Sequence, residues 1–120
     1  MNQKIQLIEK EIEQKGQAVR IIEDLDKDYE KLTGIAMLDN FGLNSELLSS
    51  SLGGSELFPK NFEALFLQSN VFVPPDMRFF SIEDREAKGN KLEIDFKDGG
   101  TAGAYPYTLR IYLRLETEGS

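Results

Sequence analysis

Residues 107–115 read Tyr-Thr-Leu-Arg-Ile-Tyr-Leu-Arg-Leu, and apolar and polar side chains alternate along most of this segment. A period of two predicts a β-strand with one buried face and one face in water. The side chains predicted to face the core are Leu109, Ile111, Leu113 and Leu115. The side chains predicted to face outward, as a possible partner surface, are Arg110, Tyr112 and Arg114.

A second alternating segment lies upstream, at residues 91–97, and shorter apolar runs occur at 71–73 and 77–82. Glycine-containing turns separate the longer segments, as expected where strands reverse direction. Together they predict an antiparallel β-meander of three to four strands over residues 71–118.

The outward face of this meander has two explanations. If the segments 91–97 and 107–115 pair, Glu93 and Asp95 lie across from the outward arginines. Ion pairs between neighbouring strands are common and stabilise a sheet modestly. Pairing within the sheet is therefore the alternative to a partner surface, and we favour it.

The first quarter of the chain, residues 2–33, is predicted to be one long helix. Its apolar residues recur at steps of three and four, which matches the heptad seam of a coiled coil, although Lys15 occupies one seam position. Gly16 and Gly34 mark points at which such a helix can kink or end. The seam residues are Ile5, Ile8, Ile12, Val19 and Ile22.

Two packings would bury this apolar stripe. Contact between copies would make the protein a homo-oligomer, and contact with the chain's own sheet would bury the stripe internally. We favour the contact between subunits, because a charged position in a short seam is tolerated there as a device that sets register.

The middle of the chain completes the predicted fold. Residues 40–55 are rich in Ser, Gly and Asn and predict a flexible loop, and Pro59 suits the first turn of a short helix near 59–68. The expected fold class is therefore α+β, with a single domain over residues 1–120. In it, a long N-terminal helix and a short second helix cover an antiparallel meander.

Composition excludes several classes of function. The 120 residues contain no cysteine and no histidine, which removes disulfides, thiolate and imidazole metal sites, and His or Cys catalysis. The net charge of −7 is spread along the chain without a basic segment, so we expect no nucleic-acid partner. No apolar stretch approaches the ~20 residues of a membrane span, and no signal peptide is evident. We expect a cytoplasmic protein without a membrane partner.

Two short motifs resemble ligand-binding loops without meeting their requirements. The acidic segment 24–28 begins like a calcium loop, but Tyr29 and Ile35 occupy the positions of the required Gly and Glu. The Gly-rich segment 98–104 lacks the lysine and the following helix of a phosphate loop. We therefore expect no metal and no cofactor.

These observations favour a non-enzymatic assembly or adaptor protein that oligomerises through its N-terminal helix and presents its sheet to a protein partner. The alternative is an acidic inhibitor or immunity-type protein, which its charge of −7 would steer to a basic surface. An enzyme that uses carboxylates with Mg²⁺ is the least favoured class, because few proton carriers remain without His or Cys.

Overall fold

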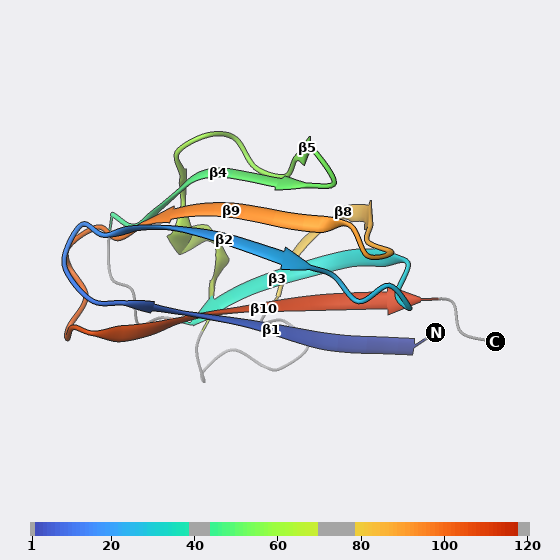
Figure 1. The fold of residues 1–120 in the computed structure, drawn as a ribbon, viewed down its shortest axis with the longest axis horizontal. Coiled ribbons are helices and arrows are strands. Elements are labelled where there is room, and N and C mark those ends of the chain that lie inside the picture. The colour runs from blue at the N-terminus through green and yellow to red at the C-terminus, as the bar shows by residue number, and fades with distance from the viewer. Residues whose placement is uncertain (1, 39–43, 70–78, 118–120) are drawn as a thin grey trace.

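The computed structural model describes residues 2–38, 44–69 and 79–117. Its strands form two sheets that run along the 46 Å axis of the molecule and share one hydrophobic core (Figure 1). No α-helix occurs within the three described ranges. The predicted α+β class is therefore wrong, and the chain folds as a β-sandwich.

The first sheet, named sheet A here, is built around β10. Its main strands, all antiparallel, follow the order β1 (Asn2–Ile12), β10 (Tyr107–Thr117) and β3 (Lys31–Leu38). Beyond β3 lie two further partners, the parallel β7 (Gln68–Ser69) and the antiparallel β8 (Phe80–Glu86). Strand β1 closes the opposite side, and β10 is its single strand partner among the described residues.

The second sheet, sheet B, is built around β9. Its main strands, again antiparallel, follow the order β2 (Ala18–Asp24), β9 (Lys91–Lys97) and β4 (Glu46–Leu52). Two short strands pair with β4, namely β5 (Ser55–Glu56) and β6 (Phe62–Glu63). The 3₁₀ helix η1 (Ala64–Leu67) then leads the chain from sheet B to sheet A.

The predicted N-terminal helix is wrong: the chain forms β1, a turn and β2 instead. All five expected seam residues are β-branched, and their restricted side-chain rotamers suit a strand better than a helix. Gly16 lies in the turn with φ of 76°, a left-handed value that glycine adopts without strain and that a helix interior excludes. Neither a kinked helix nor a coiled coil is present in this segment.

Strand geometry also divides the expected seam. In a helix its members would share one stripe, but in a strand neighbouring side chains point to opposite faces. Ile8 and Ile12 lie in the core, and Val19 packs against it. Ile5 and Ile22 are exposed on the exterior of the molecule. The predicted helical seam is therefore wrong, because some of its residues face the core and the others face the exterior.

The central region is more ordered than its composition suggests. Residues 46–52 of the expected loop form β4, and a turn with positive φ at Gly53 and Gly54 leads into β5. The serine-rich β4 remains a strand because its buried serine has a partner: Ser50 Oγ accepts a hydrogen bond from the Phe58 backbone N–H at 3.1 Å. Residues 40–43 of the expected loop lie outside the described residues.

The helix predicted near 59–68 is likewise wrong. This segment contains β6, one 3₁₀ turn and β7. Phe62 pairs with Leu47 of β4 and stacks on Phe58 with ring centres 4.6 Å apart. Pairing with a strand distant in sequence thus outweighs the local helical spacing.

The predicted meander is wrong because its two longest strands do not pair. The alternating segments at 91–97 and 107–115 do form strands, but β9 belongs to sheet B and β10 to sheet A. The connection between them therefore crosses the sandwich. Of the shorter expected strands, the run at 71–73 and the start of the run at 77–82 lie outside the described residues.

The inner faces of both sheets form the core. Strand β10 contributes the four residues expected there, and β9 contributes every second residue from Leu92. Burying a side chain of this size contributes about 1.5–3 kcal/mol. The largest side chains with almost no exposure are Phe96, Ile12, Leu32, Ile35, Met37, Leu47, Leu67, Leu92, Ile94, Leu109 and Ile111.

Candidate functional site

The three outward residues of β10 lie on the exterior of sheet A, and their arginines already have partners within the chain. Arg110 Nε donates a hydrogen bond to Glu9 Oε2 of β1 at 3.0 Å. Both side chains are well exposed, so this pair contributes at most about 1 kcal/mol. Tyr112 lies half-buried opposite Leu7 of β1. That these residues bind a partner stays a prediction.

Arg114 supports a β-bulge in strand β3. The register of β3 against its neighbours shifts around Thr33. Arg114 Nε and Nη2 donate hydrogen bonds to Thr33 Oγ1 and to the Thr33 carbonyl oxygen, each at 3.0 Å, and Thr33 Oγ1 donates to Glu116. The guanidinium carbon also lies 5.4 Å from the centre of the Phe79 ring. The Arg114 side chain therefore has a structural role at the bulge.

Gly34→Ala is expected to lower the free energy of unfolding by about 1–3 kcal/mol, as overpacking typically does. A Cβ at this position would lie 3.0 Å from Phe79 Cβ and 3.1 Å from Arg114 Cζ. Relieving that contact moves the guanidinium away from the bulge. Urea denaturation of the purified variant measures the loss.

The matched control for this change is Gly103→Ala. An added Cβ there meets no atom within 4 Å, so we expect a change within about 0.5 kcal/mol. Equal stability of the two variants would show that the close packing around Gly34 does not matter.

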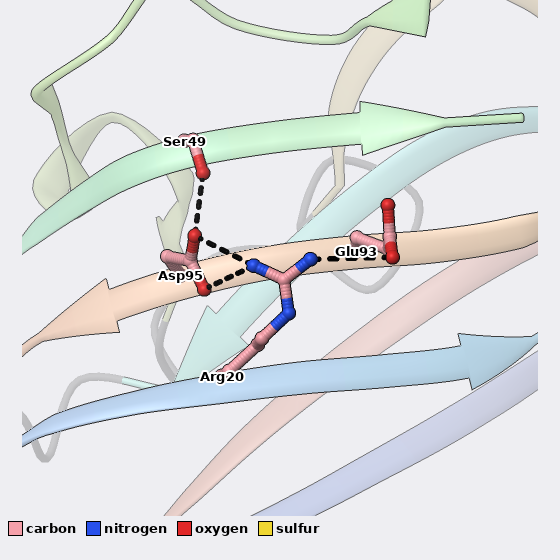
Figure 2. Close-up of polar contacts among 4 residues, drawn as sticks. All are labelled: Arg20, Ser49, Glu93 and Asp95. Atoms are coloured by element: carbon pink, nitrogen blue, oxygen red, sulfur yellow. Dashed lines mark hydrogen bonds and ion pairs between the residues drawn. The ribbon is translucent and has the colours of Figure 1, made fainter. Parts of the chain in front are cut away.

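Glu93 and Asp95 bind Arg20 of β2 rather than the arginines of β10. Figure 2 shows the Arg20 side chain between the two carboxylates. Arg20 Nη1 lies 3.1 Å from each Asp95 oxygen, and Nη2 donates to Glu93 Oε1 at 3.3 Å. Ser49 Oγ donates to Asp95 Oδ2 at 2.8 Å. This polar cluster connects β2, β9 and β4 across the exterior of sheet B.

A shallow hollow of about 200 Å³ lies beside the polar cluster. Its hydroxyl groups and carboxylates can form hydrogen bonds with a polar group. Within the described ranges, no three acidic side chains converge as a metal site would require. The lining residues are Arg20, Ser49, Ser50, Ser51, Gly54, Glu56 and Glu93.

A buried carboxylate, Asp98, connects the loops at one end of the sandwich. It accepts hydrogen bonds from the hydroxyls of Tyr105 and Tyr107, each at 2.6 Å. It also accepts hydrogen bonds from the backbone N–H groups of Gly16 at 3.1 Å and Gly100 at 3.0 Å. In Figure 1 the turn between β1 and β2 lies beside the connection between β9 and β10, and Asp98 joins them.

The electrostatics of this network follow from its hydrogen bonds. Burial alone would raise the pKa of Asp98, but the four donors stabilise the carboxylate and lower its pKa below the ordinary value. Burial and the hydrogen bond to Asp98 raise the pKa of Tyr107. This network was not predicted from the sequence, where its one signal is an aspartate followed by two nearby tyrosines.

The acidic segment 24–28 holds the start of β1 in place. Lys4 Nζ lies 2.5 Å from Asp26 Oδ2, and this hydrogen bond raises the pKa of Lys4 and lowers that of Asp26. Gln6 Nε2 donates to the Asp24 carbonyl oxygen, and the Asp26 N–H donates to Gln6 Oε1, both at 3.2 Å. The segment that begins like a calcium loop is thus a connection that contacts β1.

The remaining feature is the edge of sheet A at β1, which has no second strand partner within residues 2–38, 44–69 and 79–117. Strand β1 is 11 residues long, and its exterior face carries Ile5 and Leu7, which are 47% and 44% exposed. They lie in an uncharged stretch between Lys4 and Glu9. A free edge presents unpaired backbone N–H and C=O groups. Edge strand β1, with Ile5 and Leu7, is therefore the candidate site.

Ile5 was predicted to lie in a helical seam, and Leu7 was not among the predicted site residues. The alternation of Ile5 and Leu7 with Lys4 and Gln6 indicates a strand, but by itself it would place Ile5 and Leu7 in the core. Their exposure follows from the burial of Ile8 and Ile12 on the opposite face of β1.

Comparison with protein-family models, with curated proteins and with solved structures finds no match to this chain. Among the described residues, no helix has the length and apolar character needed to cross a membrane.

Proposed function

We propose that this chain is a non-enzymatic assembly protein that binds a protein partner by adding a strand at β1. One observation carries the proposal, namely the combination of an 11-residue edge strand with exposed Ile5 and Leu7. Backbone hydrogen bonds along such an edge give affinity, and the side chains on its faces give specificity.

The charge distribution along β1 supports this choice of site. Proteins often protect a free edge with charged side chains that oppose pairing. The charges of β1 lie at Lys4 and from Glu9 onward, and they leave the stretch from Ile5 to Ile8 without charge. That stretch is long enough for a partner strand to form backbone pairs without burying an unpaired charge.

Three other features support a binding role over catalysis. The chain lacks cysteine and histidine. Arg20, Arg110 and Arg114 form hydrogen bonds with side chains of the chain itself. The Asp98 carboxylate accepts four hydrogen bonds. The lack of cysteine also fits action in the cytoplasm, where we expect the assembly to form.

Co-purification from the native host tests the proposal. We expect the tagged wild-type chain to retain specific partner proteins. Leu7→Lys should weaken their binding about tenfold, because a charge in a buried apolar contact costs about 1.4 kcal/mol or more. Ile22→Lys is the matched control, since Ile22 is a similarly exposed isoleucine, at 52%, on the other sheet. Circular dichroism confirms that both variants are folded.

Equal recovery of partners by Leu7→Lys and the wild type would overturn the proposed site. Loss of partners with Ile22→Lys alone would move the interaction to the exterior of sheet B.

A further inference from the structure

We infer that the strand added at β1 is β1 of a second copy of this chain, so that two A sheets join across a two-fold axis. The inference rests on the proposed function, because it names the partner of the same edge. The order of side chains along β1 is self-complementary in one register.

Symmetry limits the registers that are available. Two copies of one strand related by a two-fold axis run antiparallel, and opposed residues must project from the same face of the joined sheet. One residue of β1 therefore lies at the axis, opposite its own copy. The choice of that central residue determines every other pair.

A register centred on Gln6 brings the exposed apolar side chains together. Ile5 lies opposite the partner's Leu7, and Leu7 lies opposite the partner's Ile5, so four exposed aliphatic side chains meet on one face. In the same register Lys4 lies opposite Ile8, and Glu9 lies opposite Gln3. No two like charges face each other, which a stable cross-strand pairing requires.

A register centred on Leu7 is unfavourable on both faces. It places Lys4 opposite the partner's Lys10, and by symmetry it does so twice. It also places each Ile5 opposite Glu9. Like charges directly opposed destabilise a sheet, and a carboxylate opposite Ile5 leaves only the two Leu7 side chains in apolar contact.

The remaining close alternatives leave fewer exposed apolar side chains opposite each other than the Gln6 register does. Centring on Ile8 places both Ile5 and Leu7 opposite glutamates. Centring on Ile5 places Leu7 opposite Gln3 and shortens the overlap at the start of the strand. The Gln6 register is therefore the one in which Ile5 and Leu7 contact each other across the axis.

The contacts of β1 with the 24–28 segment prepare this edge for pairing. The side chains of Lys4 and Gln6 are held on the inner side of β1 by Asp26 and by the Asp24 carbonyl oxygen. Side chains that are ordered before binding lose less conformational entropy when a partner arrives. A single strand pair is a small interface, so we expect a dimer whose population rises with concentration.

Cysteine cross-linking tests the register directly, because the chain has no cysteine of its own. Ile5→Cys and Leu7→Cys variants, one of them carrying a mass tag, are mixed in equal amounts and oxidised. A disulfide needs Cα atoms about 4.4–6.8 Å apart, a separation that directly opposed residues meet and diagonal neighbours exceed.

The Gln6 register predicts the mixed disulfide as the main product. Random collision of two variants in equal amounts would give the mixed disulfide in about half of the products. A larger share requires that the two cysteines lie close together in the dimer. Excess Leu7→Cys homodimer would place Leu7 at the axis, and excess Ile5→Cys homodimer would place Ile5 there. Either excess, or the random distribution, overturns the proposed register.

Light scattering of the wild type separates this inference from the proposed function. We expect the mass to rise with concentration toward twice 13.6 kDa, with Ile22→Lys behaving alike and Leu7→Lys remaining a monomer. A wild-type monomer at every concentration would overturn pairing between copies. In that case, loss of another co-purified protein by Leu7→Lys would still support strand addition at β1.

Discussion

Ile111→Ala is expected to lower the free energy of unfolding by about 2–5 kcal/mol. Ile111 is 1% exposed at the centre of β10, which lies between β1 and β3 in the middle of sheet A. Removing its side chain leaves a cavity in the core that the neighbouring side chains fill only in part. A domain of this size has a total stability of about 5–15 kcal/mol, so the loss is severe. Urea denaturation followed by circular dichroism measures it.

Arg110→Ala is the control on the opposite face of the same strand. It removes one exposed pair with Glu9, so we expect a loss of at most about 1 kcal/mol. Comparable losses for Ile111→Ala and Arg110→Ala would contradict the inward and outward assignment of β10. A loss below about 0.5 kcal/mol for Ile111→Ala would contradict the packing of the core.

Asp98→Asn is expected to be the second strongest change, with a loss of about 3 kcal/mol. The carboxylate accepts four hydrogen bonds, and an amide can accept through its oxygen alone while its NH₂ group faces donors. The amide oxygen can keep the three donors that reach Oδ2, and the NH₂ group then faces the Tyr107 hydroxyl that donates to Oδ1. The estimate combines loss of that bond, about 1.5–3 kcal/mol, with the weakening of the other three bonds when the charge is removed. Denaturation at neutral pH measures the loss.

The pH dependence distinguishes loss of the charge from loss of packing. The pKa of Asp98 is lowered in the folded chain, so its stabilisation is complete above the unfolded pKa of about 3.9. It is lost as pH falls from there through the folded pKa, because the folded state must then accept a proton. Stability of Asp98→Asn should fall less than that of the wild type below about pH 4. Parallel profiles would show that the Asp98 charge does not stabilise the fold.

Tyr107→Phe tests one hydrogen bond of the Asp98 network. The variant keeps the ring in the core and removes only the hydroxyl that donates to Asp98 at 2.6 Å. We expect a loss of about 1.5–3 kcal/mol, the contribution of one hydrogen bond to a charged group. A loss equal to that of Asp98→Asn would show that the remaining three donors contribute nothing.

Strand β10 was predictable because its signal is local. The alternation from Tyr107 to Leu115 places one apolar face on a strand wherever that strand pairs, and the buried side chains are those expected. The same holds for β9. The choice of neighbours was not predictable from either segment, because each could pair with any strand of matching alternation, and they belong to different sheets.

The prediction of a helix for the N-terminal segment was wrong for a related reason. Ile5, Ile8 and Ile12 satisfy a helical spacing, while Ile8 and Ile12 also satisfy a strand spacing. Pairing of all 11 residues of β1 with β10 resolves the ambiguity, and those residues lie about a hundred positions away in the chain. The spacing of apolar residues within a segment cannot indicate a partner strand at that distance in the chain. The β-branched residues of the segment did favour a strand.

Composition and alternation alone therefore establish an acidic chain without histidine or cysteine chemistry, and they identify the inner faces of β9 and β10. Those properties depend on single residues and their nearest neighbours. The tertiary structure decides that Arg20 rather than Arg110 binds Asp95, that Asp98 joins two loops, and that β1 lies at an edge with Ile5 and Leu7 exposed. Each of these depends on which distant strands pair, and backbone pairing is the same for any sequence that can form a strand.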